Sequence, residues 1–257
     1  EEGELENGGA SYDEVQQIWR IQRRFHTKDG QNGCVITQVL RRHETGLRWE
    51  LSAEGMGGPW SAPLELHLRW RESGTTQFWT AWSDPLQGNK GWNDPLVFQS
   101  LQDREWFYGA PPFEEDTPRT GYCPLIGNTF CIPLAVISDS ARDQAVSLIL
   151  SPEDRLLDLT LRSTANGEVV FSHINHRLEQ GKPFSFSADL VVHKADWRAA
   201  LGWMAQRYPQ YFNPPNPRAD ELAGCGAYSS YEGPLDVEKF KRMAFRINWK
   251  ASFDFPY

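Results

Sequence analysis

The chain has 257 residues, of which 40% are hydrophobic and 23% charged, a globular composition for one large domain or two ordinary ones. Its net charge of -8 argues against nucleic acid and anionic membrane surfaces as partners, and no apolar run is long enough for a membrane span. The acidic start, EEGELENGGASYDE, lacks the basic and apolar regions of an intact signal peptide. Because a mature secreted or periplasmic protein would look the same, the localisation stays open.

The start of the chain is acidic and glycine-rich, and its pattern is then ambiguous. We expect residues 1–10 to be flexible. The stretch from Ser11 to Glu14 matches a helix capping box, and apolar residues follow it at helical spacing. The IWRIQRRF run in the same region also alternates as a strand would. Helix and strand both stay open here.

Short β-strands dominate the pattern from Cys34 to about Val192. Runs such as LELHLRWRE, AVSLILS and PFSFSADLVVH alternate apolar and polar residues, and Gly, Asn, Asp or Pro separates most of them. About ten such runs with few helical stretches predict a mainly β fold, a large antiparallel β-sandwich of the supersandwich type. We assign residues 1–193 to this domain.

The cysteines and histidines predict no metal site and no cofactor. None of the four cysteines has CxxC spacing: Cys34, Cys123, Cys131 and Cys225. The CPLIGNTFC stretch could bring two of them together across a hairpin, but we favour reduced, mostly buried thiols. His173 and His176 are three residues apart in a strand pattern, so we expect them not to share a face.

The clearest helix of the sequence follows the strands, at residues 196–208. Apolar residues recur at helical spacing, with Asp196 as a candidate N-cap, and the helix is expected to pack on the sandwich through Trp197, Leu201 and Met204. The proline-rich NPPNPRADELAG comes next. We therefore assign residues 194–223 to a linking helix and a linker.

The last residues form a compact strand–helix–strand pattern. GCGAYSS and RINWKASFDF are predicted strands, and LDVEKFKRMAF between them is an amphipathic helix with Asp236 placed to cap it. A βαβ unit has parallel strands and cannot bury both faces of its sheet alone. We therefore interpret residues 224–257 as the truncated start of a (β/α) TIM barrel.

A large β-sandwich, a linking helix, a proline-rich linker and the start of a barrel, in this order, resemble the retaining α-glycosidases of the α-galactosidase and α-glucosidase group. AVSLILSPEDRLLDLTLRS and FSHINHRLEQGKPFSFSADLVVHKADWRAALGWMAQRYPQYF are also similar to the end of such a sandwich domain in glycoside-hydrolase-like proteins. The resemblance implies a glycoside hydrolase acting on oligo- or polysaccharides. It also implies that the catalytic carboxylates lie beyond Tyr257, so that this chain alone is inactive and needs the rest of the same protein as its partner.

Two groups of residues are candidates for binding a carbohydrate substrate. Barrel sites lie at the C-terminal ends of the strands, which favours Asp254 after the second predicted strand and Tyr228 after the first. The second group is a repeated Trp-(Ser/Asn)-Asp-Pro-Leu motif with four candidate residues: Trp82, Asp84, Trp92 and Asp94. Its tryptophans could stack on a sugar or tuck back onto the sandwich.

A non-catalytic carbohydrate-binding or adhesive β-sandwich is the alternative function. The 11 Trp, 8 Tyr and 14 Phe fit either one, since aromatic rings fill sandwich cores and also stack on sugars. A binding module would not need the linking helix or the RINWKASFDFPY segment, which favours the enzyme.

Overall fold

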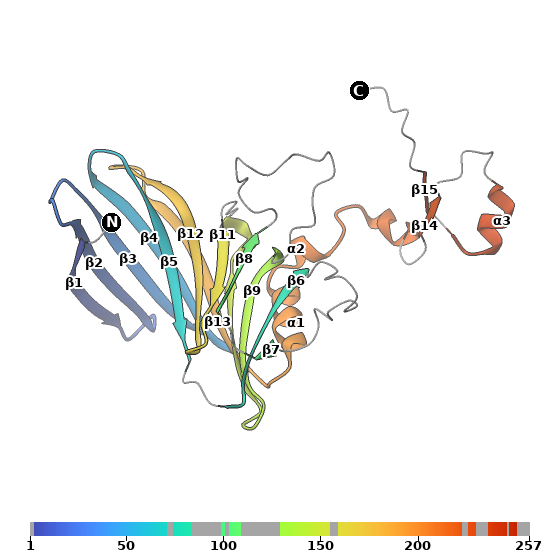
Figure 1. Cartoon of the computed structure of the whole chain (residues 1–257), viewed down its shortest axis with the longest axis horizontal. Coiled ribbons are helices and arrows are strands. Elements are labelled where there is room, and N and C mark those ends of the chain that lie inside the picture. Colours follow the sequence, from blue (N-terminus) through green and yellow to red (C-terminus); the bar gives the residue numbers. More distant parts are fainter. Residues whose placement is uncertain are drawn as a thin grey trace. The chain divides into compact units, whose positions relative to one another are not determined.

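The structure is a computed structural model, and it describes residues 3–70, 74–83, 99–100, 103–108, 129–154, 159–222, 226–229, 236–245 and 247–250. The chain divides into two compact units, Glu1–Met204 and Ala205–Tyr257 (Figure 1). Within the described ranges, no helix combines the length and the apolar character needed to cross a membrane.

The first unit is built on one 13-stranded sheet. Its strands are β1 (Gly3–Asp13), β2 (Ile18–Thr27), β3 (Asn32–His43), β4 (Gly46–Gly57), β5 (Trp60–Arg69), β6 (Thr76–Ser83), β7 (Gln99–Ser100), β8 (Arg104–Tyr108), β9 (Thr129–Asp139), β10 (Gln144–Leu150), β11 (Leu159–Ser163), β12 (Glu168–Leu178) and β13 (Phe184–His193). Their order is β1-β2-β3-β4-β13-β10-β9-β8-β11-β12-β5, and β6 joins through β9 and β7. All described pairs of this sheet are antiparallel except β8 with β9. The predicted mainly β fold is confirmed.

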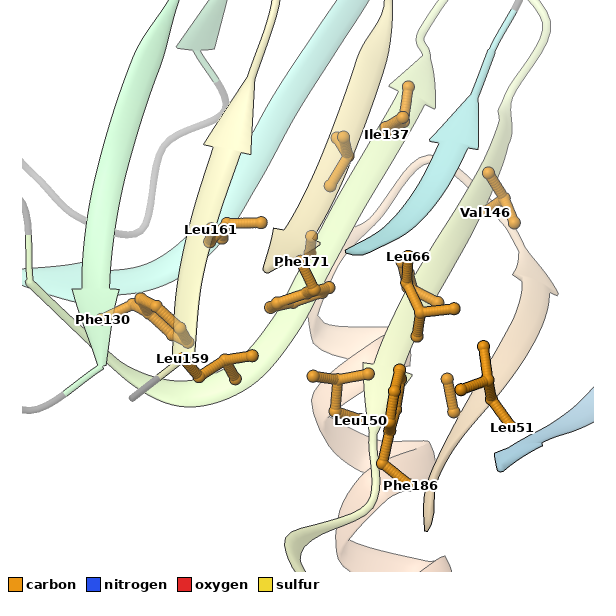
Figure 2. Packing of buried hydrophobic residues seen from close by; sticks show 14 of the residues in the cluster. Leu51, Leu66, Phe130, Ile137, Val146, Leu150, Leu159, Leu161, Phe171 and Phe186 are labelled. Carbon is orange, nitrogen blue, oxygen red and sulfur yellow. The ribbon is translucent and has the colours of Figure 1, made fainter. Parts of the chain in front are cut away.

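The sheet folds back on itself around one apolar core. Leu51 of β4 and Phe186 of β13 share a buried cluster with Leu66 of β5 and Phe171 of β12, although these strand pairs lie far apart in the strand order (Figure 2). They can meet only if the two halves of the sheet face each other, as in a sandwich. Inward side chains of both halves fill the space between them, which is the arrangement the alternating sequence runs predict.

The N-terminus differs from the flexible segment expected for residues 1–10, because β1 pairs antiparallel with β2. The capping-box sequence does not start a helix. Oδ1 of Asp13 instead accepts hydrogen bonds from the backbone N–H groups of Val15 (3.0 Å) and Gln16 (2.9 Å), and Gln17 takes a left-handed φ of 54°. These local bonds form a turn. The strand interpretation of IWRIQRRF is therefore correct.

The predicted linking helix is present as α1 (Trp197–Arg207) and packs on the first unit. Its Trp197 ring stacks on Trp79 of β6 with ring centroids 4.8 Å apart, and its Ala200 and Met204 are buried. Leu201 is only half-buried, so it contributes less to this contact than expected. The spacing predicted the helix, but it did not predict which apolar residue is covered best.

The second unit contains the strand–helix–strand pattern. Its elements are α2 (Pro209–Phe212), the 3-10 helix η3 (Pro217–Leu222), β14 (Gly226–Ser229), α3 (Val237–Arg242) and β15 (Ile247–Lys250). β14 and β15 are parallel, with Gly226 opposite Ile247. The carboxylate of Asp236 accepts a hydrogen bond from the N–H of Lys239 at 2.9 Å, as predicted for an N-cap.

The expectation about histidine needs correction, and the expectation about cysteine is tested at two positions. Cys34 is a buried free thiol, and burial raises its pKa to about 11, but the free thiol of Cys131 is exposed. His173 and His176 do meet, with ring centroids 5.0 Å apart. Between them β12 has a bulge, which adds one residue and returns the second side chain to the first one's side. Across the described residues, no group of three or more His, Cys, Asp or Glu could hold a metal ion.

Candidate functional site

A recess of about 330 Å³ lies where β3, β4 and β13 run side by side. Its polar lining comes from side chains that alternate with the core residues Leu51 and Phe186, so it opens on the outer face of the sandwich. Seven polar residues line it: Thr37, Arg48, Glu50, Ser52, Asp154, Ser185 and Ser187.

The strand register explains why these side chains meet. Ser52 of β4 pairs with Thr37 of β3 on one side and Ser185 of β13 on the other. The next outward residue of β4, Glu50, pairs with Ser187. Because neighbouring strands lie about 4.8 Å apart, these groups can contact a single small ligand.

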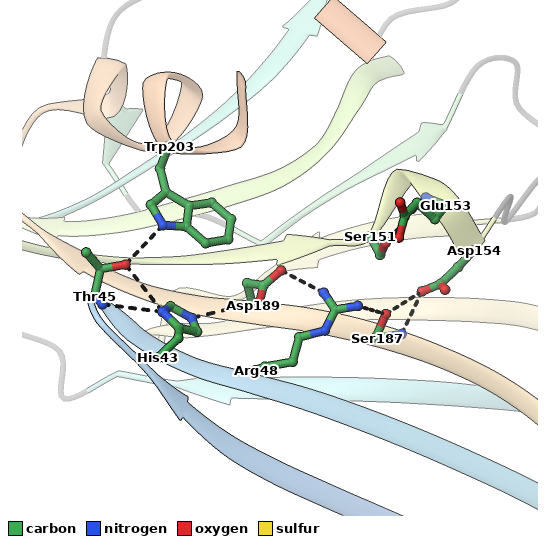
Figure 3. Close-up of polar contacts among 9 residues, drawn as sticks. All are labelled: His43, Thr45, Arg48, Ser151, Glu153, Asp154, Ser187, Asp189 and Trp203. Atoms are coloured by element: carbon green, nitrogen blue, oxygen red, sulfur yellow. Dashed lines mark hydrogen bonds and ion pairs between the residues drawn. The ribbon is translucent and has the colours of Figure 1, made fainter. Parts of the chain in front are cut away.

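A buried ion pair fixes the arginine of the recess (Figure 3). Nη1 of Arg48 donates to Oδ2 of Asp189 at 2.7 Å, where the Asp189 side chain is 2% exposed. Nη2 of Arg48 donates to Oγ of Ser187 on the recess wall. A charge-assisted pair of this kind holds the guanidinium in one orientation. A ligand in the recess would therefore meet a positioned donor.

The fourth wall is the 3-10 helix η2 (Pro152–Asp154), which is tied to β13. Oδ2 of Asp154 accepts hydrogen bonds from the N–H of Ser187 at 2.6 Å and from its hydroxyl at 3.1 Å. Burial raises the pKa of Asp154, although the two Ser187 bonds and the charge of Arg48 oppose that shift. The carboxyl thus sits in a site that favours its neutral form more than water does.

The same network continues to α1 (Figure 3). His43 Nε2 lies 3.8 Å from Oδ1 of Asp189, and its Nδ1 accepts from the N–H of Thr45 at 3.3 Å. Trp203 of α1 donates its indole N–H to the Thr45 hydroxyl at 3.0 Å, and its ring stacks on His43 with centroids 5.7 Å apart. The helix therefore braces the side of the network away from the recess.

The structure describes only some of the candidate residues predicted from the sequence. Trp82 lies in β6 opposite Phe130, and Tyr228 lies in β14 opposite Trp249. Four predicted residues lie outside the described ranges: Asp84, Trp92, Asp94 and Asp254. The recess residues were not predicted. The one available signal was the polar residue at every second position of FSFSAD in β13.

No family model matches the chain, and no curated protein matches it. Among solved structures, it is similar to a protein of Synechocystis sp. PCC 6803, with 12% identity, a TM-score of 0.44, and coverage of 74% of this chain and 65% of that one. It is also similar to a galactose mutarotase-like protein from Clostridium acetobutylicum, with 11% identity, a TM-score of 0.42, and coverage of 74% of this chain and 67% of that one. A third similar structure is the α-galactosidase from Lactobacillus brevis, with 11% identity, a TM-score of 0.42, and coverage of 96% of this chain and 35% of that one.

The chain thus spans 65% of the length of the first of these structures and 35% of the α-galactosidase. Similarities of this size do not identify an activity.

Proposed function

We propose that this chain is the non-catalytic N-terminal part of a protein that hydrolyses glycosidic bonds, and that its outer-face recess binds a neutral sugar. The recess is the observation that carries the proposal. It combines four hydroxyl groups, a positioned guanidinium and two carboxyl groups within about 330 Å³. The volume lies at the lower end of the usual range for small-molecule sites, about 300–1,000 Å³.

The chemistry of the lining suits a sugar because a sugar hydroxyl both donates and accepts hydrogen bonds. Glu50 accepts from such hydroxyls, Arg48 donates to them, and the serine and threonine hydroxyls do either. The negative charge of Glu50 disfavours an anion. A neutral, hydroxyl-rich ring is the ligand class that uses these groups together.

The hydrolytic part of the proposal rests on the order of elements. A sandwich, the helix α1, a proline-rich stretch and a parallel strand–helix–strand unit follow one another as in the α-glycosidases that the sequence resembles. Glycoside hydrolysis commonly uses two carboxyl groups about 5–9.5 Å apart. We place that pair on later barrel strands, with Asp254 and Tyr228 as candidates for the substrate contacts of the first two.

The experiment replaces Glu50 by Gln and follows sugar binding by saturation-transfer NMR against neutral mono- and disaccharides. Losing a charged acceptor should weaken binding about tenfold, which corresponds to about 1.4 kcal/mol. Glu54→Gln is the matched control. Glu54 points outward from the same strand beyond the recess, and a glutamine oxygen can still accept the bond that Glu54 receives from the N–H of Gly181.

Two results would contradict the recess assignment. One is that no neutral sugar binds the wild-type chain at millimolar concentration. The other is that Glu50→Gln and Glu54→Gln weaken binding equally. Sugar binding that depends on Glu50, together with no hydrolysis by any longer form of the protein, would instead favour the carbohydrate-binding module over the enzyme.

A further inference from the structure

The opposite, inward face of β1 to β4 carries a second group of residues, away from the recess. Cross-strand pairing aligns Tyr12, Trp19, Leu40 and Trp49, one from each strand, in a row that we call the aromatic row. The Tyr12 and Trp19 rings are in contact, with centroids 4.6 Å apart. The row leads to Ala188 of β13, which belongs to the core, so it lies on the inward side of the sheet.

The opposing half of the sandwich covers only one end of this face. At that end Trp60 of β5 stacks on Phe25 with centroids 6.1 Å apart, and the backbone of Leu178 in β12 lies against Gly55. At the other end, Tyr12 is 45% and Trp19 48% exposed. The aromatic row is therefore the accessible continuation of the core face.

The carboxylates of these four strands all lie on one face, whereas arginines occur on both. The inward positions carry Arg23 and Arg42 and no carboxylate, in a protein whose net charge is -8. All five carboxylates of the four strands point outward: Glu4, Glu6, Asp13, Glu50 and Glu54. The accessible inward face is thus a cationic, aromatic surface on an acidic molecule.

Two donors on this face also make no hydrogen bond in the described part of the chain. They are the indole N–H of Trp49 and the Nε–H of Arg23, and both atoms are buried. Leaving such donors unpaired is costly. Because neither atom is accessible in the unliganded chain, these donors would reach acceptors of a ligand only if the two side chains shift on binding.

We propose that the aromatic row and its two arginines bind an acidic oligosaccharide, one built from uronate units. Sugar rings stack on the Tyr12–Trp19 pair and on Trp49, which is two strands away from Trp19, a distance of about 10 Å. Arg42 lies at the next inward position beside the row, and Arg23 lies two inward positions away on its other side. They pair with carboxylates of successive sugar units, because a guanidinium binds a carboxylate through two parallel hydrogen bonds. The arginines and the lack of carboxylates on this face distinguish its ligand from the neutral sugar of the recess.

This surface is additional to the proposed function, and it rests on that function only in the choice of a sugar as the ligand. The two sites lie on opposite faces of β4. Glu50 points into one and Trp49 into the other, so variants can separate them.

The test is affinity gel electrophoresis of the 257-residue chain in polygalacturonate, with fully methyl-esterified polygalacturonate as the neutral matched polymer. The wild-type chain should be retarded by the acid polymer and not by the ester. Trp19→Ala and Arg42→Gln should each weaken retardation about tenfold, which corresponds to about 1.4 kcal/mol. Arg24→Gln is the control, because Arg24 pairs with Glu6 on the outward side of β2, and Glu54→Gln on the outward side of β4 should also leave retardation unchanged.

Retardation by both polymers alike, by neither, or equally by the wild type and the two inward variants would overturn the proposal. Sedimentation velocity tests whether a second copy of the chain occupies this face instead, because it would then detect a dimer. A wild-type dimer that Trp19→Ala converts to a monomer would also overturn it. Circular dichroism checks that each variant folds, and the exposed Arg42 keeps the test decisive if Trp19→Ala does not.

Discussion

Single residues of the recess owe their behaviour to neighbours that are remote in the sequence. Arg48 and Asp189 are separated by 141 positions, yet their side chains are 2.7 Å apart because β4 and β13 pair in register. Removing one partner of such a buried pair leaves the other charge uncompensated. The recess therefore keeps its positioned guanidinium only while both Arg48 and Asp189 are present.

The raised pKa of Asp154 predicts how stability depends on pH. Burial favours the neutral carboxyl in the folded state, so the contribution of Asp154 to stability is fully present below its ordinary pKa of 3.8 and declines as pH rises through the higher folded value. Relative to Asp154→Asn, the melting temperature of the wild type should therefore fall as the pH is raised from 3.5 to 7, a range set about that pKa. Differential scanning fluorimetry measures both melting temperatures. A wild-type melting temperature that rises relative to that of Asp154→Asn as the pH is raised would contradict the assignment.

For single residues, the sequence predicts roles that depend on near neighbours in the chain but not roles that depend on distant ones. Asp236 was placed correctly as a helix cap because a cap acts on the N–H three residues away. Ser185 and Ser187 look like ordinary outward positions of a strand. They form one side of a recess only because they pair with Ser52 and Glu50, and the sequence of neither strand alone predicts that pairing.

Among the elements, α1 gives the clearest energetic prediction. Met204 is 2% exposed, whereas Leu201 is half-buried. Met204→Ala should lower the free energy of unfolding by about 2–5 kcal/mol, the usual cost of truncating a buried side chain of this size. Leu201→Ala should cost less, because part of that side chain already contacts water. Urea unfolding of the two variants measures both values, and a larger loss at Leu201 would show that the helix packs differently.

Strand and helix content followed from periodicity, but irregularities did not. The IWRIQRRF run fitted a strand and a helix equally, and Asp13 decided the outcome by closing a turn with two backbone bonds. His173 and His176 were expected on opposite faces because a regular strand has a period of two. The bulge in β12 breaks that period, and the local sequence does not predict the bulge.

On the scale of the whole molecule, two compact units each retain part of what the sequence predicted. The sandwich accounts for the core, the recess and the aromatic row. The parallel pair β14 and β15 supports the proposed beginning of a barrel. We therefore propose that sugar binds on the sandwich and that bond cleavage takes place on later barrel strands.

The most direct measurement of this division is glycosidase activity, assayed with aryl α- and β-glycosides at acid and neutral pH. The 257-residue chain and a longer form of the same protein are compared side by side. We predict no turnover by the 257-residue chain and hydrolysis by the longer form, which Glu50→Gln does not abolish. Turnover by the 257-residue chain alone, lost when a carboxylate within it is replaced, would contradict the account and place a complete active site in this chain.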